Sequence, residues 1–269
     1  MLDLSGVFGL PGKVAVVTGG GNGIGEAVAT VLAGVGARVV VADIALDRAE
    51  AVATQIEADG GEAVGAYVDV ASKESVDELV DAAVARWGSL DILVNNAGIM
   101  TRRPAAEISA EEFRRVLDVN LGSVLYGCQA AARAMADGGA VINTLSEIID
   151  RGTAGTGSYA AAKKGAEALT RTFAVELGAR GIRVNGVAPA WTVSNMTRRR
   201  GLGADGEYHQ ELFDEVRGRL ESLSLLGVVH EPVDIAYAVL YLAARPGQKI
   251  SGQTLRVKRR LVNGVRERA

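Results

Sequence analysis

Cysteine is almost absent from this sequence, because Cys128 is the one cysteine among 269 residues. A single cysteine excludes both an intrachain disulfide framework and a zinc site built on several thiolates. The two histidines, His209 and His230, are isolated and have no metal-like partners. We therefore expect no bound metal, and the lack of disulfides fits a reducing compartment, so we expect a cytoplasmic protein.

Long apolar runs and an excess of charge of one sign are also missing. Every apolar run is broken well short of the ~18 residues that a membrane span requires, and the amino-terminal MLDLSGVFGLPGK lacks the pattern of a signal peptide. The 29 Lys and Arg residues against 32 Asp and Glu residues give a net charge of −3. This balance is too close to neutral for a protein built around nucleic acid or an anionic membrane. A small molecule is the partner that we expect.

Aromatic residues make up only 4% of the chain, whereas 34 residues are glycine. The core is therefore expected to consist mainly of Val, Ala, Leu and Ile, with close backbone approaches. Short β-branched runs alternate with longer helical stretches; the runs lie at residues 13–19, 37–43, 62–70, 90–98, 140–146, 183–189 and 253–257. This alternation predicts an α/β fold, with one domain over residues 1–269 and a doubly wound parallel sheet of about seven strands covered by helices on both faces.

A glycine-rich segment follows the first predicted strand and opens a predicted helix. Gly19, Gly23 and Gly25 stand where the backbone can turn sharply and approach a pyrophosphate. The charge of the pyrophosphate would be met by the N-terminus of the helix. The segment therefore predicts a dinucleotide-binding loop.

Asp43 ends the second predicted strand, eighteen residues beyond Gly25. A carboxylate at this point can accept hydrogen bonds from both hydroxyls of an adenosine ribose, and it repels a 2′-phosphate. Asn22, rather than Arg, precedes Gly23 and withholds a cation that a 2′-phosphate would need. The alternative for Asp43 is a helix N-cap, but the glycine loop favours ribose binding. NAD(H) is therefore predicted over NADP(H).

The T-G-x-x-x-G-x-G spacing of residues 18–25 resembles the short-chain dehydrogenase/reductase family, and later motifs match it as well. They are Asn95-Asn96-Ala97-Gly98, Asn120, and Ser146 thirteen residues before Tyr159, which begins Tyr159-Ala-Ala-Ala-Lys163. The resemblance covers about residues 10–242 and implies a Rossmann-like fold, an oxidoreductase and a homotetramer or homodimer. It implies cofactor contacts by Gly19, Asn22, Gly23, Ile24, Gly25, Asp43, Asp69, Val70, Asn96, Ala97, Gly98, Tyr159, Lys163, Pro189, Thr192 and Ser194.

Asn120, Ser146, Tyr159 and Lys163 are the predicted catalytic residues. Residues four apart share a helix face, so Lys163 lies beside Tyr159, and Ser146 at a strand end can face both. Lowering the pKa of a phenol from near 10 to about 7 takes roughly 4 kcal/mol, which Lys163 and a positively charged nicotinamide can supply. Tyr159 would then exchange a proton with the substrate oxygen, which Ser146 would orient. By resemblance, Lys163 also binds the nicotinamide ribose, and Asn120 keeps a water in a proton relay.

Two stretches depart from the family pattern. Ala190 replaces a glycine after Pro189, and the hydroxyl expected to contact the carboxamide is carried by Thr192 or Ser194. The family's final V-D-G-G is replaced by VKRR at residues 257–260, which leads into a basic tail at about 258–269. This second departure weakens the implied oligomer.

Each feature predicted on the substrate-binding side has two alternative interpretations. Trp191 forms either a substrate wall or part of the core. Arg151 could bind a substrate carboxylate or phosphate, but exposure or pairing with Asp150 is favoured. The polar segment at about 194–222 is either a mobile substrate lid or a solvated surface excursion.

The sequence thus favours an NAD(H)-dependent oxidoreductase that interconverts a secondary alcohol and a ketone. The stretch from Pro189 to Met196 resembles bacterial hydroxysteroid dehydrogenases of the same family, so a hydroxysteroid-like or other cyclic alcohol is the substrate hint. A 3-oxoacyl thioester (acyl carrier protein) reductase is the alternative enzyme, although such reductases usually prefer NADPH. A catalytically silent nucleotide-sensing protein is a third hypothesis, which the four intact catalytic positions disfavour.

Overall fold

The computed structural model describes residues 6–150, 152–198, 202, 207–222, 224 and 226–257. Its strands form one sheet in the order β3-β2-β1-β4-β5-β6-β7, and every neighbouring pair is parallel. The strands are β1 (Val14–Thr18), β2 (Arg38–Asp43), β3 (Glu62–Tyr67), β4 (Ile92–Asn95), β5 (Ala140–Thr144), β6 (Arg183–Pro189) and β7 (Thr254–Val257). The predicted parallel sheet of about seven strands is confirmed.

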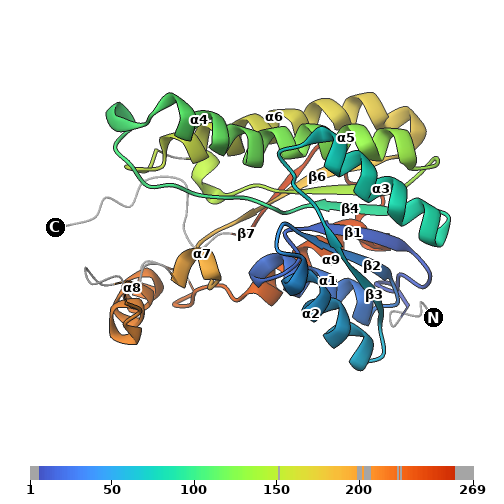
Figure 1. Cartoon of the computed structure of the whole chain (residues 1–269), viewed down its shortest axis with the longest axis horizontal. Coiled ribbons are helices and arrows are strands. Elements are labelled where there is room, and N and C mark those ends of the chain that lie inside the picture. Colours follow the sequence, from blue (N-terminus) through green and yellow to red (C-terminus); the bar gives the residue numbers. More distant parts are fainter. Residues whose placement is uncertain are drawn as a thin grey trace.

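Helices cover both faces of the sheet, as Figure 1 shows. One layer consists of α1 (Gly23–Gly34), α2 (Leu46–Ala58) and α9 (Pro232–Ala243). The other consists of α3 (Lys73–Trp87), α4 (Ala110–Leu117), α5 (Ser123–Ala134) and α6 (Gly157–Leu177). The remaining helical segments are η1 (Ala105–Glu107), η2 (Asp118–Gly122), η3 (Glu147–Asp150), η4 (Gly178–Arg180), α7 (Asn195–Arg198), α8 (Gln210–Ser222) and η6 (Arg245–Gly247).

Consecutive residues of β1 face opposite layers of helices. Ala15 and Val17 pack in the cluster formed with α1, α2 and α9, whereas Val16 packs in the cluster formed with α3, α5 and α6. All three residues are fully buried. Burial on both faces explains why the strands read as continuous apolar runs rather than as alternating ones.

The strand order reverses at β1, which pairs with β2 on one side and with β4 on the other. Parallel strands end at one edge of the sheet, and ligands of such sheets bind at the carboxyl ends where the order reverses. Thr18 ends β1, Asn95 ends β4 and Thr144 ends β5. The glycine loop, the Asn-Asn-Ala-Gly segment and Ser146 follow these three strand ends, so the fold brings the predicted motifs to one edge.

The helical stretch expected between the strand runs at 90–98 and 140–146 is interrupted by the π-helical turn η2, which separates α4 from α5. Asn120 lies inside this turn, and its side-chain amide donates to the carbonyl oxygens of Ile99 and Val116, each at 2.9 Å. A π-helical turn carries an extra residue, and such turns frequently mark functional sites. Here the turn contains one of the predicted catalytic residues.

The expected lid at about 194–222 contains the two helices α7 and α8. Residues 199–201 and 203–206 of this segment, and the basic tail at 258–269, lie outside the described residues. Phe213 of α8 is buried with Val193 and Val229 in a small apolar cluster that is separate from the main core. The segment is therefore attached to the rest of the molecule through apolar contacts.

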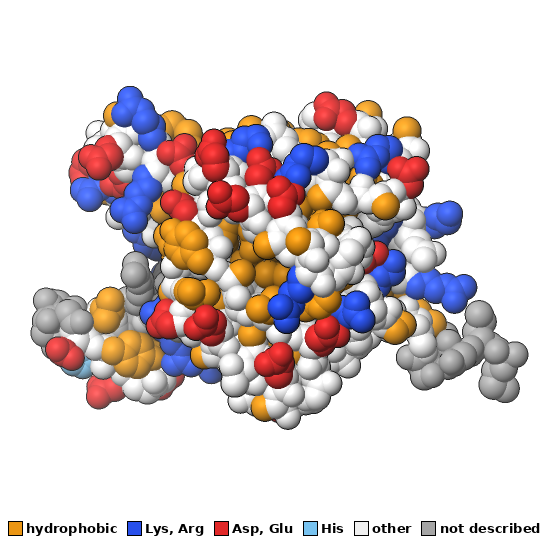
Figure 2. All heavy atoms as spheres, turned by 45° about the vertical axis from the view of Figure 1, so that its right-hand side comes forward, with side chains coloured by type: hydrophobic (Ala, Val, Ile, Leu, Met, Phe, Trp, Pro, Cys, Tyr) orange, Lys and Arg blue, Asp and Glu red, His pale blue; other side chains and the backbone are white. Residues whose placement is uncertain are grey.

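The face drawn in Figure 2 carries Lys and Arg side chains intermixed with Asp and Glu side chains, and hydrophobic side chains near its middle. This face presents no patch of a single charge. No helix in the described part of the chain is long and apolar enough to cross a membrane.

Candidate active site

The glycine loop between β1 and α1 has a backbone that only glycine fits. Gly19 and Gly23 have φ angles of 64° and 58°, in the left-handed region that side chains disfavour. A Cβ on Gly25 would lie 2.0 Å from the Gly19 carbonyl oxygen, and a Cβ on Gly19 would lie 2.8 Å from Cα of Ala97. The Asn22 side chain makes no capping hydrogen bond to the described first turn of α1, so the N–H groups of this turn face outward for an anion. The loop therefore fits a pyrophosphate.

Asp43 closes this loop from the end of β2. Its Oδ2 accepts a hydrogen bond from the Gly21 amide at 3.0 Å, and its Oδ1 accepts one from the Ala45 amide at 3.0 Å. Ala45, not Asp43, is the N-cap residue of α2, so the alternative of a simple helix cap does not describe Asp43. Each carboxylate oxygen keeps further acceptor capacity, which is what a ribose diol would use.

Asp69 and Val70 follow β3, next to this position. The Val68 amide donates to the Asp43 carbonyl oxygen at 3.0 Å, which joins the ends of β2 and β3. Oδ1 of Asp69 accepts a hydrogen bond from the Ala71 amide at 3.0 Å, and Val70 is 8% exposed. This pair, which the family resemblance implies as a cofactor contact, therefore lies beside the predicted ribose contact.

Asn96 connects the ends of three strands. Its Nδ2 donates to the carbonyl oxygens of Thr18 at 3.0 Å and Gly19 at 3.2 Å, and its Oδ1 accepts from the Thr144 hydroxyl at 3.3 Å. The side chain predicted to contact the cofactor is thus engaged by the protein and shapes the glycine loop. The side chain of Ile24, also predicted to contact the cofactor, is likewise engaged by the protein. It packs against the helix layer of α1, α2 and α9.

Ser146, Tyr159 and Lys163 meet at the carboxyl end of β5. Tyr159 stands in the first turn of α6, and Lys163 follows one turn later. The Lys163 Nζ lies 5.8 Å from the centre of the Tyr159 ring and donates a hydrogen bond to the Thr144 carbonyl oxygen at 2.6 Å. Ser146, two residues beyond β5, lies close enough to the Tyr159 phenol to lower its pKa. A hydroxyl, a phenol and an ammonium group therefore converge at one point.

Burial controls the acid–base properties of this group. Burial raises the pKa of the Tyr159 phenol to about 12, although the hydrogen bond with Ser146 acts in the opposite direction. Burial lowers the pKa of the Lys163 ammonium to about 8. From the sequence we expected Lys163 and a positively charged nicotinamide together to lower the pKa of this phenol to about 7. In the protein alone, burial outweighs the hydrogen bond, and the phenol stays protonated at neutral pH.

Asn120 lies next to Lys163, across from Gly98. A Cβ on Gly98 would come within 2.7 Å of the Asn120 Oδ1 and 3.6 Å of the Lys163 Nζ. The Asn120 Oδ1 also accepts a hydrogen bond from the Ile99 amide at 3.3 Å. The side chain of Asn120 thus fixes the loop after β4 against the π-helical turn, and its expected part in a water relay stays a prediction.

The segment after β6 reaches the glycine loop through Ser194. A Cβ on Gly23 would lie 3.4 Å from the Ser194 Cβ. The Thr192 hydroxyl donates to the Ala190 carbonyl oxygen at 3.1 Å and is buried, and Pro189 at the end of β6 pairs with Val257 of β7. The structure therefore places Ser194 against the glycine loop, and the expected contact of Thr192 or Ser194 with the carboxamide stays a prediction.

The two predicted substrate contacts outside the catalytic group have different outcomes. The Trp191 ring packs on Phe213 with ring centres 5.8 Å apart, and its buried Nε1 has no hydrogen-bond partner among the described residues. Arg151 lies outside the described residues. Asp150, expected as a partner of Arg151, forms an ion pair with Arg256.

Sequence reasoning missed two contributors to the site. The Thr144 carbonyl oxygen that accepts the Lys163 hydrogen bond is a backbone atom, so no side-chain motif could predict it. The pairing of Arg256 with Asp150 spans 106 positions of sequence. The strand-like run at residues 253–257 and the charge on Asp150 were visible, but their proximity depends on the sheet order.

Comparisons with known proteins agree over nearly the whole chain. A family model described as Enoyl-(Acyl carrier protein) reductase matches residues 19–259. The chain is 37% identical over 253 residues to the mitochondrial borneol dehydrogenase of Lavandula x intermedia, covering 92% of this chain and 90% of that protein. It is 35% identical over 251 residues to a 3-oxoacyl-(acyl-carrier-protein) reductase of Chlamydia muridarum, covering 92% and 96%. A solved 7α-hydroxysteroid dehydrogenase complexed with NADH and 7-oxo glycochenodeoxycholic acid superposes with a TM-score of 0.85 at 32% identity, covering 96% of each chain.

Proposed function

Because the chain belongs to the short-chain dehydrogenase/reductase family, we propose that it is an NAD(H)-dependent oxidoreductase that interconverts a secondary alcohol and a ketone. The observation that carries the proposal is the meeting of Ser146, Tyr159 and Lys163 beside a glycine loop that fits a pyrophosphate. This is the arrangement that transfer of a proton next to a bound dinucleotide requires.

When bound, the nicotinamide would supply the hydride acceptor or donor. Tyr159 carries the proton on its phenol oxygen and exchanges it with the oxygen of the substrate. Ser146 lowers the pKa of this phenol and orients the same substrate oxygen. The charge of Lys163 favours the phenolate through space, because its hydrogen bond goes to the Thr144 carbonyl oxygen. Asn120 holds the neighbouring loop in place.

The preference for NAD(H) rests on Asp43. Its carboxylate is buried, fixed by the amides of Gly21 and Ala45, and placed directly behind the glycine loop. A 2′-phosphate brought to this point would meet a negative charge in a site with little access to water, which is costly. A ribose diol would instead donate hydrogen bonds to the same oxygens.

A cyclic, largely apolar alcohol is the substrate class that we favour. Borneol and the hydroxysteroids are cyclic secondary alcohols, and proteins named for them resemble this chain over more than nine-tenths of its length. Trp191 and Val193, directly before the segment that we propose as the substrate lid, form an apolar cluster with Phe213 inside that segment. Such a cluster suits a hydrophobic ring better than a polyol.

A 3-oxoacyl thioester reductase is the second candidate, and the resemblance to the reductase of Chlamydia muridarum favours it. The two candidates differ in the expected cofactor, because the carboxylate of Asp43 disfavours the NADPH that thioester reductases usually prefer. Relative binding of NADH and NADPH therefore separates them.

We also propose a cytoplasmic homo-oligomer. Val233, Tyr237 and Tyr241 recur every four residues along α9 and are 37%, 58% and 38% exposed, which leaves an apolar stripe on its outer face. Sedimentation of the purified protein would measure its mass in solution, and a mass equal to one chain at micromolar concentration would contradict the oligomer.

The test of the proposed function is a set of initial rates with NAD⁺ and NADP⁺, followed through the absorbance of the reduced nicotinamide. The panel contains hydroxysteroids, bicyclic and monocyclic alcohols, polyols and 3-hydroxyacyl thioesters. Turnover of a cyclic alcohol with NAD⁺ is the expected result. Exclusive turnover of the thioester with NADP⁺ would favour the second candidate, and silence across the panel despite tight NADH binding would contradict both.

A further inference from the structure

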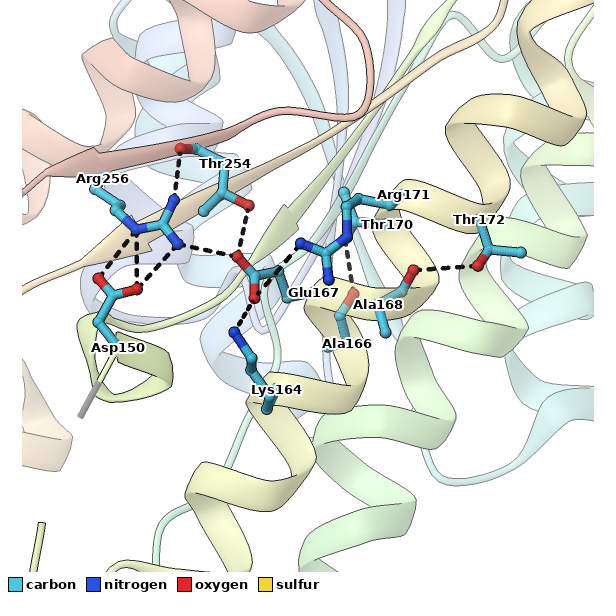
Figure 3. Close-up of polar contacts among 10 residues, drawn as sticks. All are labelled: Asp150, Lys164, Ala166, Glu167, Ala168, Thr170, Arg171, Thr172, Thr254 and Arg256. Atoms are coloured by element: carbon cyan, nitrogen blue, oxygen red, sulfur yellow. Dashed lines mark hydrogen bonds and ion pairs between the residues drawn. The ribbon is translucent and has the colours of Figure 1, made fainter. Parts of the chain in front are cut away.

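Arg256 of β7 contacts both Asp150 of η3 and Glu167 of α6 (Figure 3). The Arg256 Nε lies 3.1 and 3.0 Å from the two carboxylate oxygens of Asp150, and its Nη2 lies 2.9 Å from the Asp150 Oδ1. The same Nη2 donates to Oε1 of Glu167 at 3.0 Å. One guanidinium group therefore holds two carboxylates that come from different elements.

Both carboxylates are close in sequence to the catalytic group. Asp150 ends η3, which begins directly after Ser146 and is bonded to it, because the Ile149 amide donates to the Ser146 carbonyl oxygen at 3.2 Å. Glu167 lies on α6, one turn beyond Lys163 and two turns beyond Tyr159. The contacts of Arg256 thus join the element that positions Ser146 to the element that positions the phenol.

Glu167 has cationic partners besides Arg256, so its charge does not depend on Arg256 alone. The Glu167 side chain is 3% exposed and also pairs with Lys164 at 2.6 Å and Arg171 at 3.9 Å. Burial raises the pKa of Glu167, but the Lys164 hydrogen bond and the charges of Lys164, Arg256 and Arg171 bring it below its ordinary value. Glu167 therefore keeps two cations when Arg256 is replaced, so a variant at this position is expected to fold.

The Asp150 contact is geometrically demanding. It uses the planar guanidinium in a bidentate contact, with side chains that are 15% and 32% exposed. An arginine fork fixes the direction as well as the distance of its partner, whereas a lysine ammonium fixes only the distance.

We propose that Arg256 is a positioning residue for the proposed oxidoreductase reaction, which holds η3 against α6 and thereby sets the placement of Ser146 relative to Tyr159. The inference rests on the proposed function. Arg256 reaches the reaction only through Asp150 and Glu167, and the distance between the Ser146 hydroxyl and the Tyr159 phenol is the quantity that it controls.

Loosening this contact has a chemical consequence that a loss of stability alone does not have. The hydrogen bond with Ser146 lowers the pKa of the Tyr159 phenol, against the effect of burial. When η3 moves away from α6, this stabilisation of the phenolate is lost, and the phenol pKa rises. The pH at which alcohol oxidation gains its base then moves upward.

The experiment compares Arg256→Gln, Arg256→Lys and Asp150→Asn with a matched control, Arg133→Gln. Arg133 also bridges two carboxylates, Asp77 and Asp81, but it joins α5 to α3 instead of contacting η3 or α6. Each enzyme is assayed for kcat against pH with NAD⁺ and the best alcohol, for the Kd of NADH, and for hydrogen exchange of the peptide covering residues 146–150.

For Arg256→Gln we expect kcat to fall about 10- to 100-fold, because a shift of one ångström in a reacting group has effects of this size. The pH profile should move upward, the Kd of NADH should change little, and exchange should accelerate in the 146–150 peptide. Asp150→Asn should behave in the same way, Arg256→Lys should recover part of kcat, and Arg133→Gln should match the wild type.

Unchanged kcat and pH profile in Arg256→Gln would overturn the inference. A fall in kcat that is accompanied by an equal loss of NADH affinity and by faster exchange throughout the sheet would overturn it as well, since this pattern reports a general loss of stability. Absence of turnover in the wild type would instead contradict the proposed function, and the exchange of the 146–150 peptide would still decide whether Arg256 holds η3.

Discussion

Lys163 and Tyr159 lie one helical turn apart and are not hydrogen-bonded to each other. The Lys163 Nζ is 5.8 Å from the centre of the phenol ring, and its hydrogen bond goes instead to the carbonyl oxygen of Thr144 at 2.6 Å. In the proposed reaction the ammonium would therefore act on the phenol through its charge, and its own position is set by the Thr144 carbonyl oxygen at the end of β5. In the proposed reaction, the group that transfers the proton is thus separate from the group that makes the transfer favourable.

Replacing Tyr159 with Phe removes the hydroxyl and keeps the ring. We expect kcat to fall by about 10²- to 10⁴-fold, the usual contribution of a positioned acid or base, while the Kd of NADH stays nearly unchanged. The control is Tyr237→Phe, because Tyr237 is a 58% exposed tyrosine on α9. Turnover retained by Tyr159→Phe would remove the phenol from the mechanism.

Lys163 makes the stability of the protein depend on pH. Burial lowers its pKa from 10.5 to about 8, so between these values the folded protein binds fewer protons than the unfolded chain. The free energy of unfolding should therefore rise as the pH rises from 8 towards 10.5. A shift of this size corresponds to on the order of 3 kcal/mol.

Urea unfolding at several pH values tests this expectation. The series ends near pH 10, since the pKa of Tyr159, raised to about 12, makes stability fall above the ordinary phenol value of 10.0. The variant Lys163→Met should lose the rise, whereas Lys249→Met, at an exposed lysine, should keep it. A rise of equal size in Lys163→Met would show that another group is responsible.

The alternation of strands and helices and the positions of the motifs could be predicted from the sequence, because both depend on local patterns. The π-helical turn around Asn120 could not be predicted from the sequence, since that turn is stabilised by Ile99, a residue from a different loop. The raised pKa of the Tyr159 phenol could not be predicted from the sequence either. That shift comes from packing against residues such as Val116, and the depth of burial is a property of the folded chain.

Asp43 should decide which cofactor is preferred. Replacing it with Ala removes the proposed acceptors of the ribose hydroxyls, and a lost charged hydrogen bond of about 1.5–3 kcal/mol corresponds to a roughly 10- to 100-fold weaker affinity for NADH. The affinity for NADPH should fall less or rise, because the repulsion of the 2′-phosphate disappears. Fluorescence titration of both cofactors measures the ratio, with Asp47→Ala as the control at an exposed neighbour. An unchanged ratio would show that the carboxylate does not contact the ribose.

Two glycines of α1 offer a matched test of the loop. A Cβ on Gly25 would lie 2.0 Å from the Gly19 carbonyl oxygen, whereas a Cβ on Gly34 would meet nothing within 4 Å. Gly25→Ala must therefore push the glycine loop out of place, and we expect a loss of about 1–3 kcal/mol or more in unfolding free energy together with a weaker affinity for NADH. Gly34→Ala should stabilise the helix by up to about 1 kcal/mol without changing that affinity. Thermal unfolding and NADH titration of both variants check the pair, and a Gly25→Ala protein that binds NADH as tightly as the wild type would show that the cofactor does not need this close backbone approach.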